Sequence, residues 1–340
     1  MLTPLSNRPA TPFPNEIFQA IFRYLPQSQL CEICALSRTF HEEVVGALYQ
    51  QCELIHITID QFISWASLLV IRTDLARMVR TLILPGLLHD ANGFLGQNLD
   101  QLEEVLPRTL KSLNNLKSLL IEPHFLEDSS CSSAHYLNGE HFLGCRFRLT
   151  TFRNSFADYW TPDTLLPFLI EQKEIQDLKL DPDYEEPEAD LNGLLPKLSI
   201  VHTVLRLNSP SKPIVGAIAS RQLTRLKLHL PSRSIDDIRD AIQMFSSAGT
   251  TLMYFDIHMH ARSWLTGETH RAQVLEIISS TLPNIRFLRY SVPFAIDVCG
   301  CLYSAVGLTH KHPSQTLGGG SRFRRSFPNS NTLRCWLWTS

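Results

Sequence analysis

A six-residue string of the type Leu-x-x-Leu-x-Leu recurs along most of this 340-residue chain. The alternation at the end of each string predicts a short strand with one buried face. The strings occupy residues 79–84, 116–121, 149–154, 175–180, 201–206, 223–228, 252–257 and 285–290. Their central apolar positions are Leu82, Leu119, Phe152, Leu178, Val204, Leu226, Phe255 and Leu288. Successive central positions are 37, 33, 26, 26, 22, 29 and 33 residues apart, and a recurring unit of this size predicts a solenoid.

Helical patterns separate the strings. The predicted helices cover residues 98–113, a start at Thr161-Pro162-Asp163, 235–245 with Ser234 as its cap, and 268–282. Before the first string, Cys52–Asp60 alternates and predicts a strand, and Gln61–Ile71 predicts a helix. A strand that buries one face against its own helix can cover the open edge of its neighbour. The fold class expected is therefore α/β, with a parallel sheet in a curved strand–helix solenoid. An α/β domain with a parallel sheet but no repeat is the alternative.

The segment from Phe13 to Tyr49 has a different, purely helical pattern. Pro14 suits the first position of a helix that Pro26 ends, and Ser28 is a candidate cap for a second helix. A third helix follows, with apolar residues from Phe40 to Leu48 at i, i+4, i+7 and i+8. Fewer than 40 residues rarely make an independent core, so this segment needs a partner chain or the rest of the protein to cover it.

This segment resembles an F-box. The matching residues are Pro14, Glu16, Ile17, Ile21, Phe22, Leu25, Leu30, Leu36, Ser37, Arg38, Phe40, Leu48 and Tyr49. Phe13 stands where that family has a leading Leu, and the resemblance covers about an eighth of the chain. An ordinary N-terminal helical hairpin packed on its own domain is the alternative.

The region after the F-box-like segment resembles the irregular leucine-rich-repeat-like regions of many fungal F-box proteins. The string from Arg72 to Leu82, which leads from a helix into the first repeat strand, supports this resemblance. The uneven spacing and the lack of a recognisable buried Asn after most strings depart from the strict repeat. The predicted organisation is a disordered segment 1–10, an F-box at 11–50, a solenoid at 51–296 and an irregular tail at 297–340.

Composition and charge exclude several classes of protein. The formal net charge is −2, which gives no reason to expect nucleic acid or an anionic membrane as a partner. The first 14 residues lack the apolar run of a signal peptide, and eight scattered Cys predict free thiols in a reducing compartment, cytoplasmic or nuclear. Phe62–Ile71 is too short to span a bilayer, and Val292–Leu308 is interrupted by Pro293, Asp297 and two Gly.

Motifs for catalysis or metal binding are weak. The chain has no Gly-rich phosphate loop, nucleophile elbow or His-Glu-x-x-His sequence, and no cofactor is expected. Cys31-x-x-Cys34 lacks a second pair at zinc-site spacing, and Cys299 and Cys301 with His310 and His312 form a weaker candidate. His258 and His260 share one face of a predicted strand and indicate either a metal or partner site or a solvated surface. The six carboxylates at 181–190 indicate a solvated acidic loop rather than a calcium site.

The tail changes character near Asp297. Residues 298–340 contain five basic residues, no acidic ones and no period, which predicts disorder. Those charges could form a small nucleic-acid or lipid patch. A translated intron or a shifted reading frame is a further hypothesis for this segment.

The F-box resemblance implies a non-catalytic interaction protein. It would be the substrate-recognition subunit of a Skp–cullin–F-box ubiquitin ligase, docked on the Skp-type adaptor and, through it, on the cullin. The adaptor-binding residues expected are Pro14, Ile17, Ile21, Leu30, Leu36, Phe40 and Leu48. The repeat region would bind an unidentified target protein, with candidate contacts at Lys179, Arg206, Lys227, His258 and Arg289. An α/β hydrolase or transferase with structural N-terminal helices, and an F-box scaffold outside ubiquitin ligases, are the alternatives.

Overall fold

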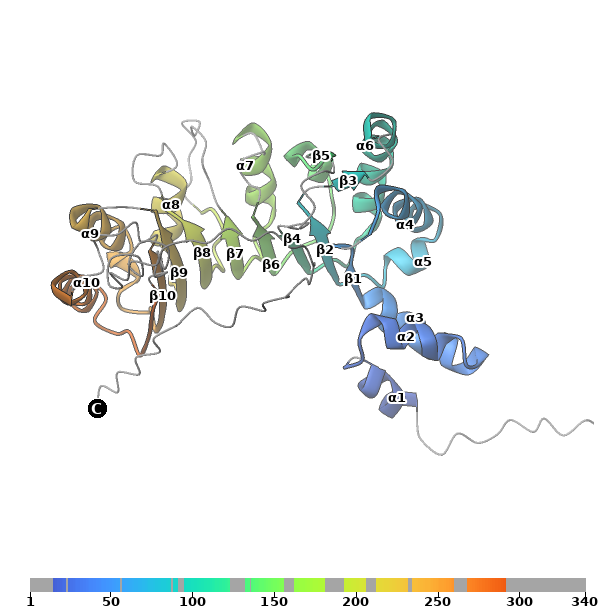
Figure 1. The fold of residues 1–340 in the computed structure, drawn as a ribbon, viewed down its shortest axis with the longest axis horizontal. Helices are drawn as coiled ribbons and strands as arrows, with labels where there is room; N and C mark the ends of the chain where they lie inside the picture. The colour runs from blue at the N-terminus through green and yellow to red at the C-terminus, as the bar shows by residue number, and fades with distance from the viewer. Residues whose placement is uncertain are drawn as a thin grey trace, which may run out of the picture. The chain divides into compact units, whose positions relative to one another are not determined.

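The fold is described from a computed structural model (Figure 1). The described residues are 15–22, 24–55, 57–86, 88–90, 95–122, 132–134, 136–155, 162–180, 193–205, 212–231, 234–259 and 268–291. Several sequence predictions lie outside them: the segment 1–10, Pro14, the acidic loop 181–190, Arg206, His260 and the tail 297–340, with Cys299, Cys301, His310 and His312.

The protein is α/β, with a parallel sheet of nine strands in the order β1-β2-β4-β6-β7-β8-β9-β10-β11. Every strand pair of this sheet with a described register is parallel, and β3 and β5 form a separate antiparallel pair. The chain divides into two compact units, residues 1–198 and 199–340, which are described in turn. No helix in the described part of the chain combines the length and apolarity needed to cross a bilayer.

The first unit begins with three helices, α1 (Asn15–Phe22), α2 (Gln27–Cys34) and α3 (Arg38–Gln50). Helices were predicted here, but the predicted cap of the second is wrong: α2 begins at Gln27 after Pro26, so Ser28 lies inside it. The cap that the sequence analysis missed is Ser37, whose Oγ accepts from the Phe40 N–H at 3.1 Å at the start of α3.

Five strands and their helices follow in the first unit. The strands are β1 (Gln51–Glu53), β2 (Thr81–Pro85), β4 (Ser118–Glu122), β6 (Thr151–Asn154) and β7 (Asp177–Leu180), with the short pair β3 (Leu88–Asp90) and β5 (Ser132–Ala134). The helices are α4 (Ile59–Ile71), α5 (Thr73–Ala76), α6 (Leu95–Ser112), α7 (Pro162–Glu171) and the 3-10 turn η1 (Gly139–Phe142).

The predicted strand Cys52–Asp60 is mostly wrong, because only Gln51–Glu53 pairs with β2. Thr58 and Gln61 form a capping box that starts α4 instead: the Thr58 hydroxyl accepts from the Gln61 backbone N–H, and the Gln61 side-chain oxygen Oε1 accepts from the Thr58 backbone N–H. Two satisfied N–H groups at this position stabilise a helix start against a longer strand.

The strings form buried ladders in the first unit. Register places Leu82 beside Leu119, Leu119 beside Phe152, and Phe152 beside Leu178, and all four side chains are buried. The residues three positions earlier, Val79, Leu116, Leu149 and Ile175, are buried as well. The strings therefore act as predicted here: each supplies apolar side chains in register with those of its neighbour.

The second unit continues the same pattern. It contains β8 (Ile200–Val204), α8 (Lys212–Ala219), β9 (Arg225–Leu230), α9 (Ile235–Gln243), the 3-10 turn η3 (Ser246–Ala248), β10 (Tyr254–Met259), α10 (Glu268–Thr281) and β11 (Phe287–Ser291). Ser234 caps α9 as predicted, with its Oγ accepting from the Asp236 N–H at 3.2 Å. Leu275 of α10 is an exposed hydrophobic residue.

One string was assigned the wrong register. Val201, not Val204, pairs with Leu226, which in turn pairs with Phe255 and that residue with Leu288. The string therefore begins at Leu198, three residues earlier than predicted, and Leu198 and Val201 are both buried. Its third apolar position is occupied by buried Thr203, which conceals the repeat in the sequence.

Successive strands are linked by carbonyl groups that each accept two backbone N–H groups. In the first unit, Arg80 O accepts from Lys117 and Ser118, Lys117 O from Thr150 and Thr151, and Thr150 O from Gln176 and Asp177. In the second, Ser199 O, Thr224 O and Met253 O accept in the same way from the next strand. We call these six the shared carbonyls. They fix the start of each strand against the strand before it.

Buried polar side chains complete the hydrogen bonding between strings and helices. Gln172, after α7, accepts from the Leu149 N–H at 2.9 Å and donates to Phe147 O at 3.4 Å. The Thr109 hydroxyl on α6 lies 2.9 Å from Ala66 O on α4 and joins these two packed helices. Such groups must be paired because an unpaired polar atom in the interior is costly.

Candidate functional site

The three N-terminal helices have a small core of their own. Phe22, Leu30 and Val44 are buried, and Phe18, Leu25, Ile33 and Phe40 are among the partly buried residues packed against them. The Phe18 and Phe40 rings meet edge to face with centroids 5.5 Å apart, and Phe22 lies within 6.3 Å of both. Edge-to-face contacts of this kind stabilise the packing beyond the area that they bury.

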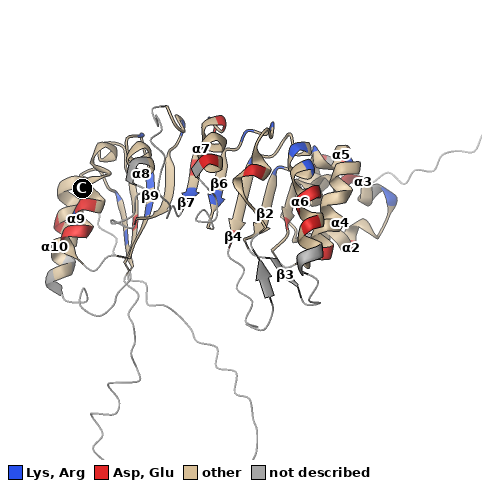
Figure 2. Ribbon diagram, turned by 90° about the horizontal axis from the view of Figure 1, so that it is seen from above, with Lys and Arg blue, Asp and Glu red and all other residues tan. Residues whose placement is uncertain are grey.

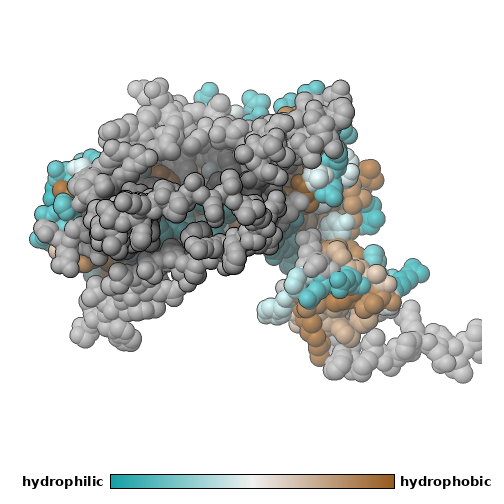
Figure 3. All heavy atoms as spheres, in the orientation of Figure 1, coloured by the Kyte–Doolittle hydropathy of each residue, from teal (hydrophilic) through white to brown (hydrophobic). Residues whose placement is uncertain are grey.

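Large apolar side chains remain outside this core. Ile17 and Ile21, one turn apart on α1, are 44% and 49% exposed, and Tyr24, in the turn after α1, is 89% exposed. Leu36, after α2, is 71% exposed. Figure 3 shows hydrophobic surface gathered over α1–α3. We call Ile17, Ile21, Tyr24 and Leu36 the exposed apolar set. Full burial of one such Ile or Leu side chain is worth roughly 1.5–3 kcal/mol, so a partner that covered the set would gain substantial binding energy.

Six of the seven predicted adaptor-binding residues are described, since Pro14 lies outside the described residues, and these six fall into two groups. Ile17, Ile21 and Leu36 belong to the exposed apolar set. Leu30 is only 5% exposed, and Phe40 and Leu48 pack against the same core, so these three residues hold the helices together in the free chain. Tyr24 was not among the predicted residues, although its position three residues after Ile21 was a usable signal.

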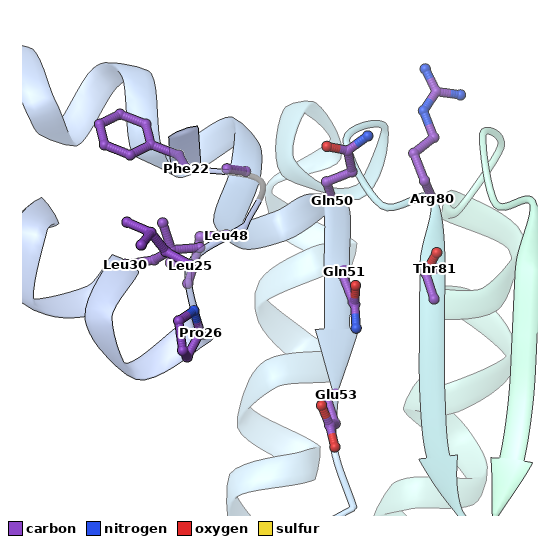
Figure 4. A pocket seen from close by; sticks show the side chains of 11 residues that line it. Phe22, Leu25, Pro26, Leu30, Leu48, Gln50, Gln51, Glu53, Arg80 and Thr81 are labelled. Carbon is purple, nitrogen blue, oxygen red and sulfur yellow. The ribbon is translucent and has the colours of Figure 1, made fainter. Parts of the chain in front are cut away.

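A groove of about 480 Å³ lies between the helices and the sheet edge (Figure 4), and none of the exposed apolar set lines it. One wall is apolar and comes from the helices and the turn between them: Phe22, Leu25, Pro26, Leu30, Ala47 and Leu48. The other wall is polar and comes from the end of α3, β1 and the start of β2, with Glu53 and Arg80 among its residues. β1 is the edge strand of the sheet. The groove could therefore accept an apolar side chain on one wall and polar groups on the other.

Three of the four cysteines described in the first unit have a raised thiol pKa. Cys31 is exposed and Cys34 is partly buried, and burial together with the neighbouring Cys31 raises the pKa of the Cys34 thiol. Burial also raises the pKa of Cys52 to about 11 and that of Cys145 to about 12. Metals and electrophiles react with thiolates, and a raised pKa disfavours the thiolate of Cys34, Cys52 and Cys145. Within the described ranges, no group of three or more His, Cys, Asp or Glu residues could hold a metal ion.

Other strongly perturbed groups in the described residues are also parts of the core. Tyr136 is buried, which raises the pKa of its hydroxyl well above the usual value, and that hydroxyl donates to Pro85 O at 2.7 Å. Burial lowers the pKa of His141, partly offset by the charges of Glu103 and Glu140. Another pocket lies near the C-terminal end of α10. Neither Tyr136 nor His141 lines that pocket or the groove beside α1–α3.

The predicted target-binding residues lie in both units. Lys179, on β7 of the first unit, donates to the Ser155 Oγ at 2.6 Å. Lys227, His258 and Arg289 lie on adjacent strands of the second unit, β9, β10 and β11. The structure adds Asp256, whose Oδ1 lies 3.0 Å from His258 Nε2 and whose Oδ2 lies 3.8 Å from Arg289. The cations were predicted from the sequence, but the carboxylate of Asp256 between them was not.

A scan against models of known protein families and a search of curated proteins both returned no match for this chain.

Proposed function

We propose that the protein is the substrate-recognition subunit of a Skp–cullin–F-box ubiquitin ligase, acting in the cytoplasm or nucleus. The observation that carries the proposal is the exposed apolar set on three helices that have a core of their own. The F-box resemblance of residues 13–49 supplies the partner, a Skp-type adaptor. Burial of Ile17, Ile21 and Leu36 by that adaptor explains why large apolar side chains stay at the surface of the free chain.

The protein would contribute position rather than chemistry. The helices would dock on the adaptor, and the strand–helix region, a leucine-rich-repeat-like solenoid, would hold a target protein near the charged ubiquitin-conjugating enzyme. Holding the target nearby raises the effective concentration of its lysines at the reactive thioester. Because α3 runs directly into the edge strand β1, the docking helices and the first unit's sheet share a continuous backbone connection. That connection would limit the freedom of a bound target.

Pull-down of the tagged full-length protein with a Skp-type adaptor from its source organism tests the proposal. The expected result is a stable complex that also recruits cullin. Ile21→Asp and Leu36→Asp should each weaken adaptor binding by about 100-fold or more, because each removes apolar contact and places a carboxylate in a desolvated interface.

Ile170→Asp is the matched control, since Ile170 of α7 is 48% exposed, close to the 49% of Ile21, but lies outside the three helices. It should bind the adaptor like the wild type. Absence of adaptor binding by the wild-type protein would refute the proposal. Adaptor binding without cullin recruitment would instead identify an F-box scaffold outside ubiquitin ligases.

A further inference from the structure

The second unit presents a patterned face formed by three strands. On β9 and β10 the side chains of Leu226, Leu228, Phe255 and Ile257 are buried, so the alternate residues point to the opposite face. Parallel register then aligns these residues in rows across the strands. The rows are Arg225–Tyr254–Phe287, Lys227–Asp256–Arg289 and His229–His258–Ser291.

The first row is an aromatic platform. The Tyr254 and Phe287 rings stack with centroids 4.5 Å apart and planes 6° from parallel, and the two residues are 36% and 39% exposed. The Arg225 guanidinium carbon lies 4.8 Å from the centre of the Tyr254 ring. This cation–π contact holds the charge of Arg225 beside the apolar platform.

The second row has two cations, Lys227 and Arg289, and one carboxylate. Asp256 is its single carboxylate, and His258 and Arg289 already contact it. Within the part of the chain that the structure describes, Lys227 and Arg225 make no ion pair. Acidic residues lie instead on the helices of this unit, at Asp236, Asp237 and Asp240 of α9, whereas Lys and Arg mark the strand β9 (Figure 2). The face therefore has a local positive charge in a chain whose net charge is −2.

We propose that this face binds an extended acidic segment of a target protein, with an apolar residue on the Tyr254–Phe287 stack and carboxylates on Lys227 and Arg289. This rests on the proposed function, since the bound segment would be the element by which a target is recognised. The spacing supports a segment that runs along the strands: rows two residues apart on a strand are about 6.6 Å apart, and side chains i and i+2 of an extended peptide have the same separation.

Asp256 favours a peptide over a nucleic acid. It lies between Lys227 and Arg289, where it would repel a continuous phosphate backbone. A peptide, in contrast, can offer N–H donors to Asp256 as well as carboxylates to the cations beside it. The stacked imidazoles of His229 and His258, with centroids 4.6 Å apart, form the next row, which would face side chain i+4 of the bound segment.

Fluorescence anisotropy with the full-length protein tests the inference. The probe is the labelled peptide Gly-Ser-Phe-Ser-Glu-Ser-Glu-Ser-Gly, compared with versions in which Ser replaces Phe, Ser replaces both Glu, or Lys replaces both Glu. The acidic peptide should bind most tightly. Lys227→Glu and Arg289→Glu should each lower the affinity for the acidic peptide by roughly tenfold, because an attractive contact becomes a repulsive one.

Matched controls separate this face from general electrostatics. Lys173→Glu makes the same charge change at an exposed site in the first unit and should leave affinity unchanged. The double variant Lys227→Glu, Arg289→Glu should gain affinity for the Lys-containing peptide. Tyr254→Ser should lower the affinity for the Phe-containing peptide and leave the affinity for the Ser-for-Phe peptide unchanged.

Two results would overturn the inference. One is equal binding of the acidic and the Ser-for-Glu peptides. The other is tighter binding of a labelled oligouridine that Lys227→Glu abolishes, which would assign the face to nucleic acid. Adaptor pull-down with the same samples keeps the proposals separate: lost peptide binding with intact adaptor binding refutes only the peptide face, and the converse refutes only the ubiquitin-ligase assignment.

Discussion

The helices α1–α3 and the strands β2–β7 of the first unit use the same apolar residue types but bury them to different extents. Leu82, Leu119 and Phe152 in the strands are fully buried, whereas Ile17, Ile21 and Leu36 in or beside the helices are 44% to 71% exposed. A strand between two others has a neighbour on each side in register, but three short helices cannot cover one another on every face. The difference shows where hydrophobic residues serve folding and where they remain available to a partner.

The largest expected effect comes from a ladder residue. Phe152→Ala removes a fully buried ring whose centroid lies 5.1 Å from that of Phe168 on α7. The free energy of unfolding should fall by about 3–5 kcal/mol, measured by urea denaturation. Phe22→Ala in the small helical core is the paired change: it should lower the helical signal while the main urea transition keeps its midpoint. Equal shifts of that transition would show that the helices and the strands unfold as one.

The next largest effect concerns buried hydrogen bonds between a string and a helix. Gln172→Leu leaves the Leu149 N–H and the Phe147 carbonyl without their partner inside the core. Stability should fall by roughly 1–3 kcal/mol in the same urea experiment. The control Gln101→Leu, on the exposed surface of α6, should change it by less than about 0.5 kcal/mol. A loss no greater than that of the control would mean that water satisfies both groups.

A smaller effect should follow pH through His141. Burial lowers the pKa of His141 below its usual 6.5, and its Nδ1 accepts from the Asn138 N–H, which requires the unprotonated nitrogen. The unfolded chain therefore takes up this proton first. The contribution of His141 to stability is present above about pH 6.5 and is lost as pH falls toward the lowered value. One proton limits the slope to about 1.4 kcal/mol per pH unit.

Melting temperatures between pH 7.5 and 5 test this expectation. The wild type should lose stability as the pH falls, and His141→Gln should show a flatter profile over the same range. Identical profiles for the two proteins would assign the pH dependence to other groups.

The smallest effect on stability is expected in the exposed apolar set. Ile21→Asp changes a half-exposed side chain in the last turn of α1, where a negative charge is mildly unfavourable to the helix dipole. The free energy of unfolding should change by less than about 1 kcal/mol, in contrast to the large loss of adaptor binding that the proposed function predicts. A destabilisation comparable with that of Phe152→Ala would show that Ile21 belongs to a core rather than to a docking surface.

Much of the fold could be predicted because the apolar spacing within each string identifies the side chains that are buried. Seven of the eight predicted central positions are each aligned with a neighbouring central position in the sheet. Their strings have an apolar residue three positions before the central one, and this spacing fits only one register. Val204 fails because Thr203 takes a buried apolar position, so the alternation shifts to the wrong residues. The strand at Cys52–Asp60 fails because its apolar alternation hides the Thr58–Gln61 capping box. Helix α8 was not predicted, since Pro213 and Gly216 mask its pattern.

The candidate sites were less predictable because exposure depends on packing. Leu30 and Leu36 have the same chemistry and lie six residues apart, yet one fills a core and the other faces solvent. Periodicity alone could not separate them, since the direction of α2 is fixed by contacts with α3. On the second unit, Lys227 and Arg289 were found as isolated charges, but only the register of three parallel strands places Asp256 between them and Tyr254 beside Phe287.

The shared carbonyls also determine how the molecule responds to force. In the second unit each strand start is bonded to the strand that precedes it in the chain, from β11 back through β10 to β9. Force applied on the C-terminal side of β11 therefore acts first on the β10–β11 pair. The β9–β10 pair bears the force only after β11 has separated. A protein-unfolding motor that begins at β11 would therefore separate one strand pair at a time, each with a small energy barrier. A motor that pulls on an inner strand would have to break the hydrogen bonds to both of its neighbours together, which is a larger barrier.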